Sequence, residues 1–214
     1  MQRTKELLLF FALLLCSVMP LCAQDFGIFP ISDSLFTIMN GSSYKEGCPI
    51  SRSVLRYVRV KHYDAQGHEH QGELVCNRQI ADDLLEIFTE LYRQRYPIER
   101  MRLIDNYGAD DERSMQANNT SCFCFRPVTG STKLSAHARG MAVDVNPLYN
   151  PCVRHKRDGS LSIQPETAKP YINRHADFDY KIDRHDLCYR LFTQHGFQWG
   201  GEWRSLKDYQ HFEK

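Results

Sequence analysis

The chain has 214 residues, with 27 basic and 26 acidic side chains dispersed along it and a formal net charge of +1. This balance leaves no basic patch for a nucleic acid, so we expect no nucleic-acid partner. About 190 residues remain after the leader described next, enough for one domain with its own hydrophobic core.

The N-terminus has the features of an export signal. Arg3 and Lys5 precede an apolar run over residues 7–15, and Ala23 ends a plausible cleavage site. The run is too short for a stable membrane span. The residues before Cys16 and Cys22 are leucines rather than the small residue expected at a lipid-attachment site. We therefore predict a signal peptide over residues 1–23 and a soluble mature protein exported to the periplasm or cell envelope.

Cysteines are frequent in the mature chain. An even number in an exported protein permits disulfides, whose pairing cannot be read from the sequence. Cys122 and Cys124 would share one face of an extended segment, which disfavours a bond between them. A zinc site built from cysteines lacks the usual C-x-x-C spacing. The six are Cys48, Cys76, Cys122, Cys124, Cys152 and Cys188.

Residues 24–49 show little periodicity, and we interpret them as an N-terminal arm laid over a domain formed by residues 50–214. Residues 54–63 and 72–76 are rich in β-branched and aromatic side chains around a turn at 64–67, which predicts a β-hairpin. His68 and His70 follow that turn. We interpret them as solvated, because the sequence near them offers no third metal ligand.

Apolar residues recur at helical spacing over residues 80–92, which predicts a helix that ends before Pro97. A short strand is expected over 101–104, a loop or short helix over 105–119, and a second helix over 186–195, ended by Gly196. These elements predict an α+β fold. We expect a small, mainly antiparallel sheet with helices on one side and a cleft on its open face.

The segment 135–144 reads S-x-H-x-x-G-x-A-x-D. Gly140 can adopt the positive φ of a tight turn, and the alternation after it is typical of a strand. Such a turn brings the imidazole of His137 and the carboxylate of Asp144 together. By contrast, we interpret the charged run over residues 154–160 as the solvated tip of a second hairpin.

The C-terminal segment offers a second histidine, His211, with Asp208 three residues before it. Together with His137 and Asp144, His211 completes a set of three ligands. Three such ligands and an exchangeable water form an open zinc site, which lowers the pKa of the water to roughly 7. Asp208 is then a candidate general base and acid rather than a fourth ligand.

These two motifs resemble the D-alanyl-D-alanine carboxypeptidase family of zinc metallopeptidases, which act on bacterial cell walls. Ser135, His137, Gly140, Ala142 and Asp144 match every fixed position of the first motif. The phrases at 146–151, 199–203 and 208–212 are most similar to the branch that includes phage L-alanyl-D-glutamate endolysins. The resemblance implies the zinc fold of these peptidases and of hedgehog proteins.

By this resemblance His137, Asp144 and His211 hold one Zn²⁺ per chain, and Asp208 takes the catalytic position where many members have Glu. The family also implies an arginine that binds substrate, for which we select Arg126; an ordinary ion pair is the alternative. Ser135 either contacts substrate, orients His137 or caps the turn. The implied activity is hydrolysis of peptide bonds in peptidoglycan stem peptides, of carboxypeptidase or endopeptidase type, by a monomer.

Two alternatives of another class remain open. One is an exported, zinc-containing binding module without catalysis, against which Asp208 argues because a structural site needs no base. The other is an adhesin-like protein stapled by disulfides. The two motifs lie about 65 residues apart, so the site requires the C-terminal segment to fold back. We expect truncation through His211 to abolish metal binding while leaving much of the domain intact.

Overall fold

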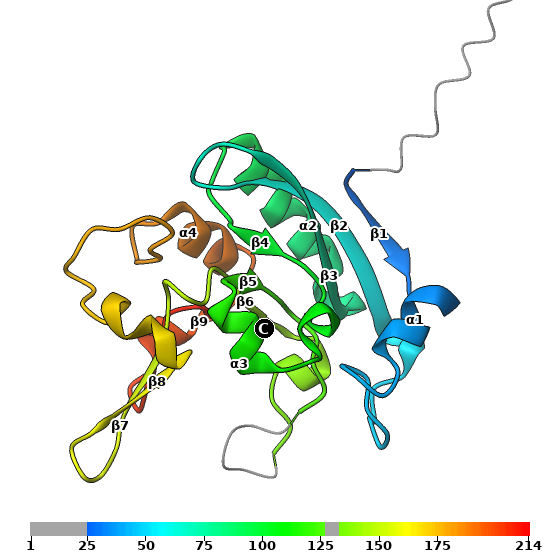
Figure 1. Cartoon of the computed structure of the whole chain (residues 1–214). Helices are drawn as coiled ribbons and strands as arrows, with labels where there is room; N and C mark the ends of the chain where they lie inside the picture. Colours follow the sequence, from blue (N-terminus) through cyan, green and yellow to red (C-terminus); the bar gives the residue numbers. More distant parts are fainter. Residues whose placement is uncertain (1–24, 127–132) are drawn as a thin grey trace, which may run out of the picture.

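The computed structural model describes residues 25–126 and 133–214 (Figure 1). The predicted signal peptide lies outside these residues. None of the described helices has the length and apolar character needed to cross a bilayer.

The longest strands form a three-stranded antiparallel sheet. Strands β2 (Leu55–Tyr63) and β3 (Glu69–Asn77) make a hairpin, and β1 (Gly27–Pro30) pairs with the other edge of β2. Buried side chains alternate along the middle of β2, at Val58, Val60 and His62. In β3 the consecutive residues Leu74, Val75 and Cys76 are all buried, because Val75 packs in a second apolar cluster with Leu55 and Phe123. Helix α2 (Arg78–Arg93) packs mainly against β2 (Figure 1).

Helix α2 forms where the sequence predicts it, two residues longer at its start and one at its end. It begins after Asn77, whose side chain accepts a hydrogen bond from the backbone N–H of Gln79. Helix α4 (Leu187–Gln194) begins after Asp186 in the same way. Phe192 of α4 meets Phe88 of α2 edge-on, with ring centroids 6.0 Å apart. The two helices therefore share one core.

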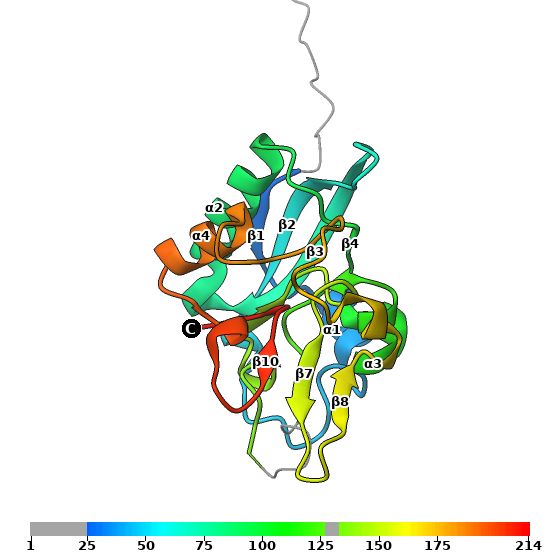
Figure 2. The ribbon, with the colours of Figure 1, turned by 90° about the vertical axis from the view of Figure 1, so that its left-hand side faces the viewer.

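The chain forms two further three-stranded antiparallel sheets, of which Figure 2 shows β10, β7 and β8 side by side. One has the order β6-β11-β9, formed by Ala142–Asp144, His211–Glu213 and Gln198–Trp199. The other has the order β10-β7-β8, formed by Lys207–Asp208, Cys152–His155 and Leu161–Gln164. The predicted α+β class is confirmed, although the strands form several small sheets rather than one.

Short elements connect these layers. Strands β4 (Arg100–Met101) and β5 (Asn119–Thr120) form a parallel pair, and α3 (Asp111–Gln116) lies between them in the chain. The strand expected over 101–104 is thus shorter, because a 3-10 turn follows at Ile104–Tyr107. Further 3-10 turns span Arg52–Val54, His137–Arg139, Glu166–Tyr171 and Gly200–Glu202.

The segment expected to be an N-terminal arm contributes structure of its own. Besides β1, it contains helix α1 (Asp33–Met39), whose Met39 is fully buried. Its domain boundary at residue 50 stays a prediction. The six cysteines within residues 25–126 and 133–214 all carry free thiols. Burial raises the pKa of the Cys76, Cys122 and Cys188 thiols, which keeps them protonated and unreactive.

The first hairpin is longer than predicted, so His70 lies within β3 rather than beyond the turn. Its ring stacks on that of His62 across the hairpin, with centroids 5.3 Å apart. Asp64 contacts both histidines of the H-x-H sequence, His68 at 3.1 Å and His70 at 2.8 Å. Both imidazoles contact the same oxygen, Oδ2 of Asp64, and these contacts hold the turn.

Candidate metal centre

Two side chains of one short segment, His137 and Asp144, meet a third from the C-terminal strand, His211, beside β6. The 3-10 turn η3 (His137–Arg139) precedes β6, and β11 pairs with β6 so that His211 lies opposite Asp144. Gly140 makes the turn possible: its φ is +68°, and a Cβ there would lie 2.7 Å from the backbone nitrogen of Asn77. The turn therefore places His137 beside Asp144.

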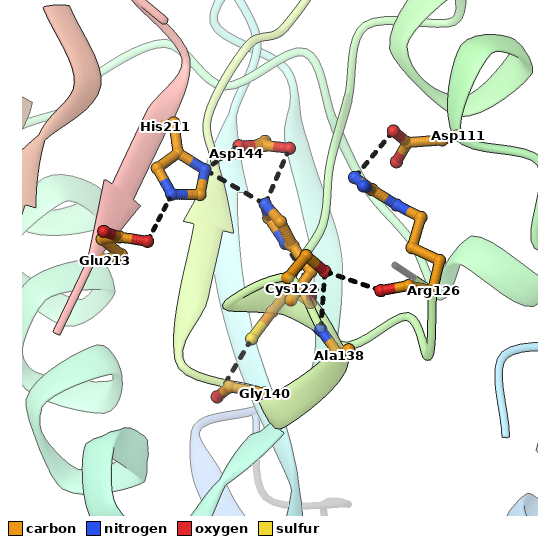
Figure 3. Close-up of polar contacts among 10 residues, drawn as sticks. Asp111, Cys122, Arg126, Ala138, Gly140, Asp144, His211 and Glu213 are labelled. Atoms are coloured by element: carbon orange, nitrogen blue, oxygen red, sulfur yellow. Dashed lines mark hydrogen bonds and ion pairs between the residues drawn. The ribbon is translucent and has the colours of Figure 1, made fainter. Parts of the chain in front are cut away.

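The three predicted ligands form a compact, buried cluster (Figure 3). Nε2 of His137 lies 3.1 Å from Nδ1 of His211 and 3.2 Å from Oδ2 of Asp144. Nδ1 of His211 lies 3.1 Å from Oδ1 of Asp144. One donor atom from each residue falls within 4.8 Å of the others, in the only such group among the described residues.

Hydrogen bonds on the outer side of each imidazole fix which nitrogen faces the cluster. Nδ1 of His137 donates to the carbonyl oxygen of Cys122 at 2.7 Å, and Nε2 of His211 donates to the carboxylate of Glu213 at 3.2 Å. In the neutral tautomers the inner nitrogens then carry lone pairs. Outer partners of this kind are typical of metal-ligating histidines.

Two lone pairs and a carboxylate facing one another repel unless a cation lies between them. Burial opposes ionisation of Asp144, but the two histidines outweigh it and hold its pKa well below the usual range. Burial likewise opposes protonation of His211, yet hydrogen bonds to Asp144 and Glu213 raise its pKa to about 10. The cluster thus favours positive charge at its centre, and its two nitrogens and one carboxylate suit Zn²⁺.

Asp208 lies beside this cluster on β10, directly opposite Cys152 of β7. Burial is the main reason that the pKa of Asp208 is raised to about 6, while nearby His211 opposes the rise. Oδ1 of Asp208 is buried and finds no hydrogen-bond partner among the described residues. A carboxylate held this way has a free acceptor for a proton-bearing group that enters the pocket.

Arg126 also lines the pocket, but its guanidinium is already paired. Its Nη2 lies 2.7 Å from Oδ2 of Asp111, at the start of α3. Nε of Arg126 is buried without a hydrogen-bond partner among the described residues. The Nε–H of this arginine is thus left for another group, and the predicted contact with substrate stays a prediction.

Ser135 is engaged with backbone on both sides. Its hydroxyl donates to the carbonyl oxygen of Arg126 at 3.1 Å and accepts from the N–H of Ala138 at 3.0 Å. These are the contacts of a residue that caps a turn, one of the roles considered above. Ser135 therefore links the extended segment to the turn that carries His137.

The cluster opens into a pocket of about 160 Å³. Trp203 forms part of its wall, with its ring 5.1 Å from that of His211, whereas Trp199 lies in the core. The pocket is lined by Asp111, Met115, Arg126, Ser135, Ala136, His137, Asp144, Cys152, Arg154, Gln164, Trp203, Leu206, Asp208, Gln210, His211 and Glu213.

Several of these residues were not predicted from the sequence. Glu213 follows His211 by two positions in a strand, a spacing that could have indicated a shared side. Cys122 contributes a backbone carbonyl, for which no sequence signal exists. Asp111, Cys152 and Arg154 reach the pocket through long-range packing.

Comparison with known proteins gives one informative result. A model of the D-alanyl-D-alanine carboxypeptidase family matches residues 129–214. The matched segment carries both motifs, with His137, Asp144, Asp208 and His211. Neither the curated proteins nor the solved structures yield a match.

Proposed function

From the membership of residues 129–214 in the D-alanyl-D-alanine carboxypeptidase family, and thus from a general peptidase function, we propose a specific activity. The protein hydrolyses peptide bonds in peptidoglycan stem peptides, with one Zn²⁺ held by His137, Asp144 and His211. Export, by way of the signal peptide proposed over residues 1–23, gives it access to this substrate. We further propose that it acts as a monomer.

One observation carries this proposal: the preorganised, buried cluster of His137, Asp144 and His211 with a carboxyl group beside it that has an unused acceptor. A purely structural metal site is closed by a fourth protein ligand and has no use for such a group. The free acceptor of Asp208 therefore favours catalysis over the zinc-containing binding module.

His137, Asp144 and His211 would hold a zinc ion, which would supply an acidified water and a Lewis acid for the substrate carbonyl. Asp208 would take up a proton at its unpartnered Oδ1 and deliver a proton to the amine of the departing fragment. Its raised pKa of about 6 keeps it ready for both roles near neutral pH. Arg126, with its unsatisfied Nε, is proposed to orient the substrate backbone through a carbonyl or carboxylate oxygen.

The decisive experiment incubates the mature protein with defined muropeptides, with and without a chelator, and identifies products by mass spectrometry. Release of terminal D-alanine identifies a carboxypeptidase, and cleavage between L-alanine and D-glutamate an endopeptidase. Zinc should restore activity after chelation. Absence of any chelator-sensitive product would refute the proposed activity.

A further inference from the structure

The hairpin formed by β7 and β8 presents one of its faces to the candidate metal centre. Asp208, Cys152 and Gln164 are direct cross-strand partners along β10, β7 and β8, so their side chains share a face. All three line the metal pocket. This small sheet is therefore a wall of the site, and the charged run over residues 154–160, for which the sequence predicts a solvated tip, begins on it.

Arg154 extends this wall away from Asp208. It lies two residues after Cys152 on β7, so its side chain points to the same face, and it too lines the pocket. Two residues along a strand cover about 7 Å. The backbone of Arg154 is thus offset by this distance, along β7, from Cys152, the cross-strand partner of Asp208.

The guanidinium of Arg154 is unpaired among the described residues. No hydrogen bond or ion pair to its side chain is found within residues 25–126 and 133–214, and the residue is exposed. Arg126, the other arginine of the pocket, is largely buried and paired with Asp111. Of the two cations, Arg154 is the one with its full set of donors free.

The other charged side chains of the pocket include carboxylates, so an unpaired cation there determines whether an acidic substrate can bind. Four carboxyl groups line the pocket, those of Asp111, Asp144, Asp208 and Glu213, and within the described residues only Asp111 is paired with an arginine, so the other three would repel an acidic substrate. A substrate carboxylate is therefore favoured only where a cation can meet it. The guanidinium fork matches a carboxylate with two parallel hydrogen bonds.

We propose that Arg154 binds a carboxylate of the substrate located one or two residues from the bond that is cleaved. The spacing follows from the offset between Asp208 and Arg154, because an extended residue spans about 3.3–3.6 Å. The inference rests on the proposed peptidase function. In a stem peptide two groups supply this chemistry, the terminal carboxylate and the α-carboxylate of D-glutamate.

The test measures kcat and KM of the zinc-loaded protein on three stem pentapeptides: unmodified, amidated at the C-terminus, and amidated at the D-glutamate α-carboxylate. Arg154→Gln is compared with Arg154→Lys and with Arg157→Gln, a control at the exposed hairpin tip. Arg154→Gln should raise KM at least tenfold on the unmodified peptide. Arg154→Lys should restore part of this loss, and Arg157→Gln should change KM less than twofold.

Amidation identifies the carboxylate. On the amidated peptide that lacks the recognised carboxylate, the KM of the wild-type protein should rise to the value that Arg154→Gln shows on the unmodified peptide. On that amidated peptide, Arg154→Gln should raise KM by less than a further twofold. The proposal is overturned if Arg154→Gln leaves KM on the unmodified peptide unchanged, or if it raises KM by the same factor on all three peptides.

A calorimetric titration of each peptide into the zinc-loaded protein separates this proposal from the proposed function. Arg154-dependent binding without cleavage would refute the peptidase activity alone. Cleavage or binding that does not depend on Arg154 would refute the role of Arg154 alone, and absence of both binding and cleavage would refute both.

Discussion

His211 lies directly opposite Asp144 in the antiparallel pair of β11 and β6, with Nδ1 of the histidine 3.1 Å from Oδ1 of the aspartate. This pairing joins the two motifs of the candidate metal centre. The next residue, Phe212, is fully buried and stacks on Phe192 of α4, with ring centroids 4.3 Å apart. The same strand thus supplies a candidate metal ligand and part of the core.

A truncation that removes His211 and Phe212 should therefore unfold the domain, contrary to our expectation from the sequence. Loss of a buried phenylalanine alone destabilises a protein by about 3–5 kcal/mol. His211→Ala should instead abolish zinc binding in a folded protein. Urea unfolding and a zinc-binding titration distinguish the two variants. A truncated protein that unfolds at the wild-type urea concentration would contradict the role assigned to Phe212.

Glu213 should control zinc affinity without touching the metal. Its carboxylate accepts the Nε2 hydrogen of His211, which directs Nδ1 towards Asp144. Removing such an outer partner weakens metal binding by about 10- to 100-fold. We expect this loss for Glu213→Ala and a smaller one for Glu213→Gln, which keeps an acceptor oxygen.

Competition with a zinc-binding dye measures these affinities, with exposed Glu46→Gln as the matched control. Equal affinities for Glu213→Ala and the control would show that Glu213 does not position His211.

Asp208→Asn should keep zinc but lose turnover. The amide preserves the volume of this buried side chain while removing its ability to take a proton, and loss of a general base lowers kcat by roughly 10²–10⁴-fold. Atomic absorption measures whether the variant keeps its zinc, and kcat on the cleaved muropeptide measures the loss of turnover. Wild-type turnover by Asp208→Asn would mean that the base is another group.

The stability of the protein should decrease in acid because of His62. This side chain is 3 % exposed, and burial, together with nearby His70 and Arg102, lowers its pKa to about 4, although its hydrogen bond with the Ile98 carbonyl opposes the shift. The folded state therefore binds the proton less readily than the unfolded state. Its contribution of about 3 kcal/mol is complete above pH ~6.5 and is lost as the pH falls towards 4.

His62→Asn retains a donor for the Ile98 carbonyl but cannot be protonated. Urea unfolding at pH 7 and pH 4.5 should show a smaller pH dependence for this variant than for the wild type or for His155→Asn, a control at an exposed position. An unchanged pH dependence in His62→Asn would exclude this histidine as the cause.

The sequence by itself determined the local elements and the identity of the candidate ligands. Helix α2 and the β2–β3 hairpin follow from the periodicity of apolar side chains, since each pattern depends only on near neighbours in the chain. Likewise Ser135, His137, Gly140 and Asp144 are fixed by one short motif. The family was recognisable from the same residues, because ligand spacing is conveyed by sequence alone.

Only the tertiary structure decided what surrounds those ligands. The orientation of the His137 ring depends on a hydrogen bond to a backbone carbonyl. The position of Asp208 depends on the pairing of β10 with β7, and the ion pair of Arg126 depends on α3, which precedes it in the chain. Arg154 belongs to a run that is indistinguishable in sequence from a solvated turn, and the register of β7 against β10 brings it to the pocket. Such contacts join distant segments through strand register and packing, which no local pattern encodes.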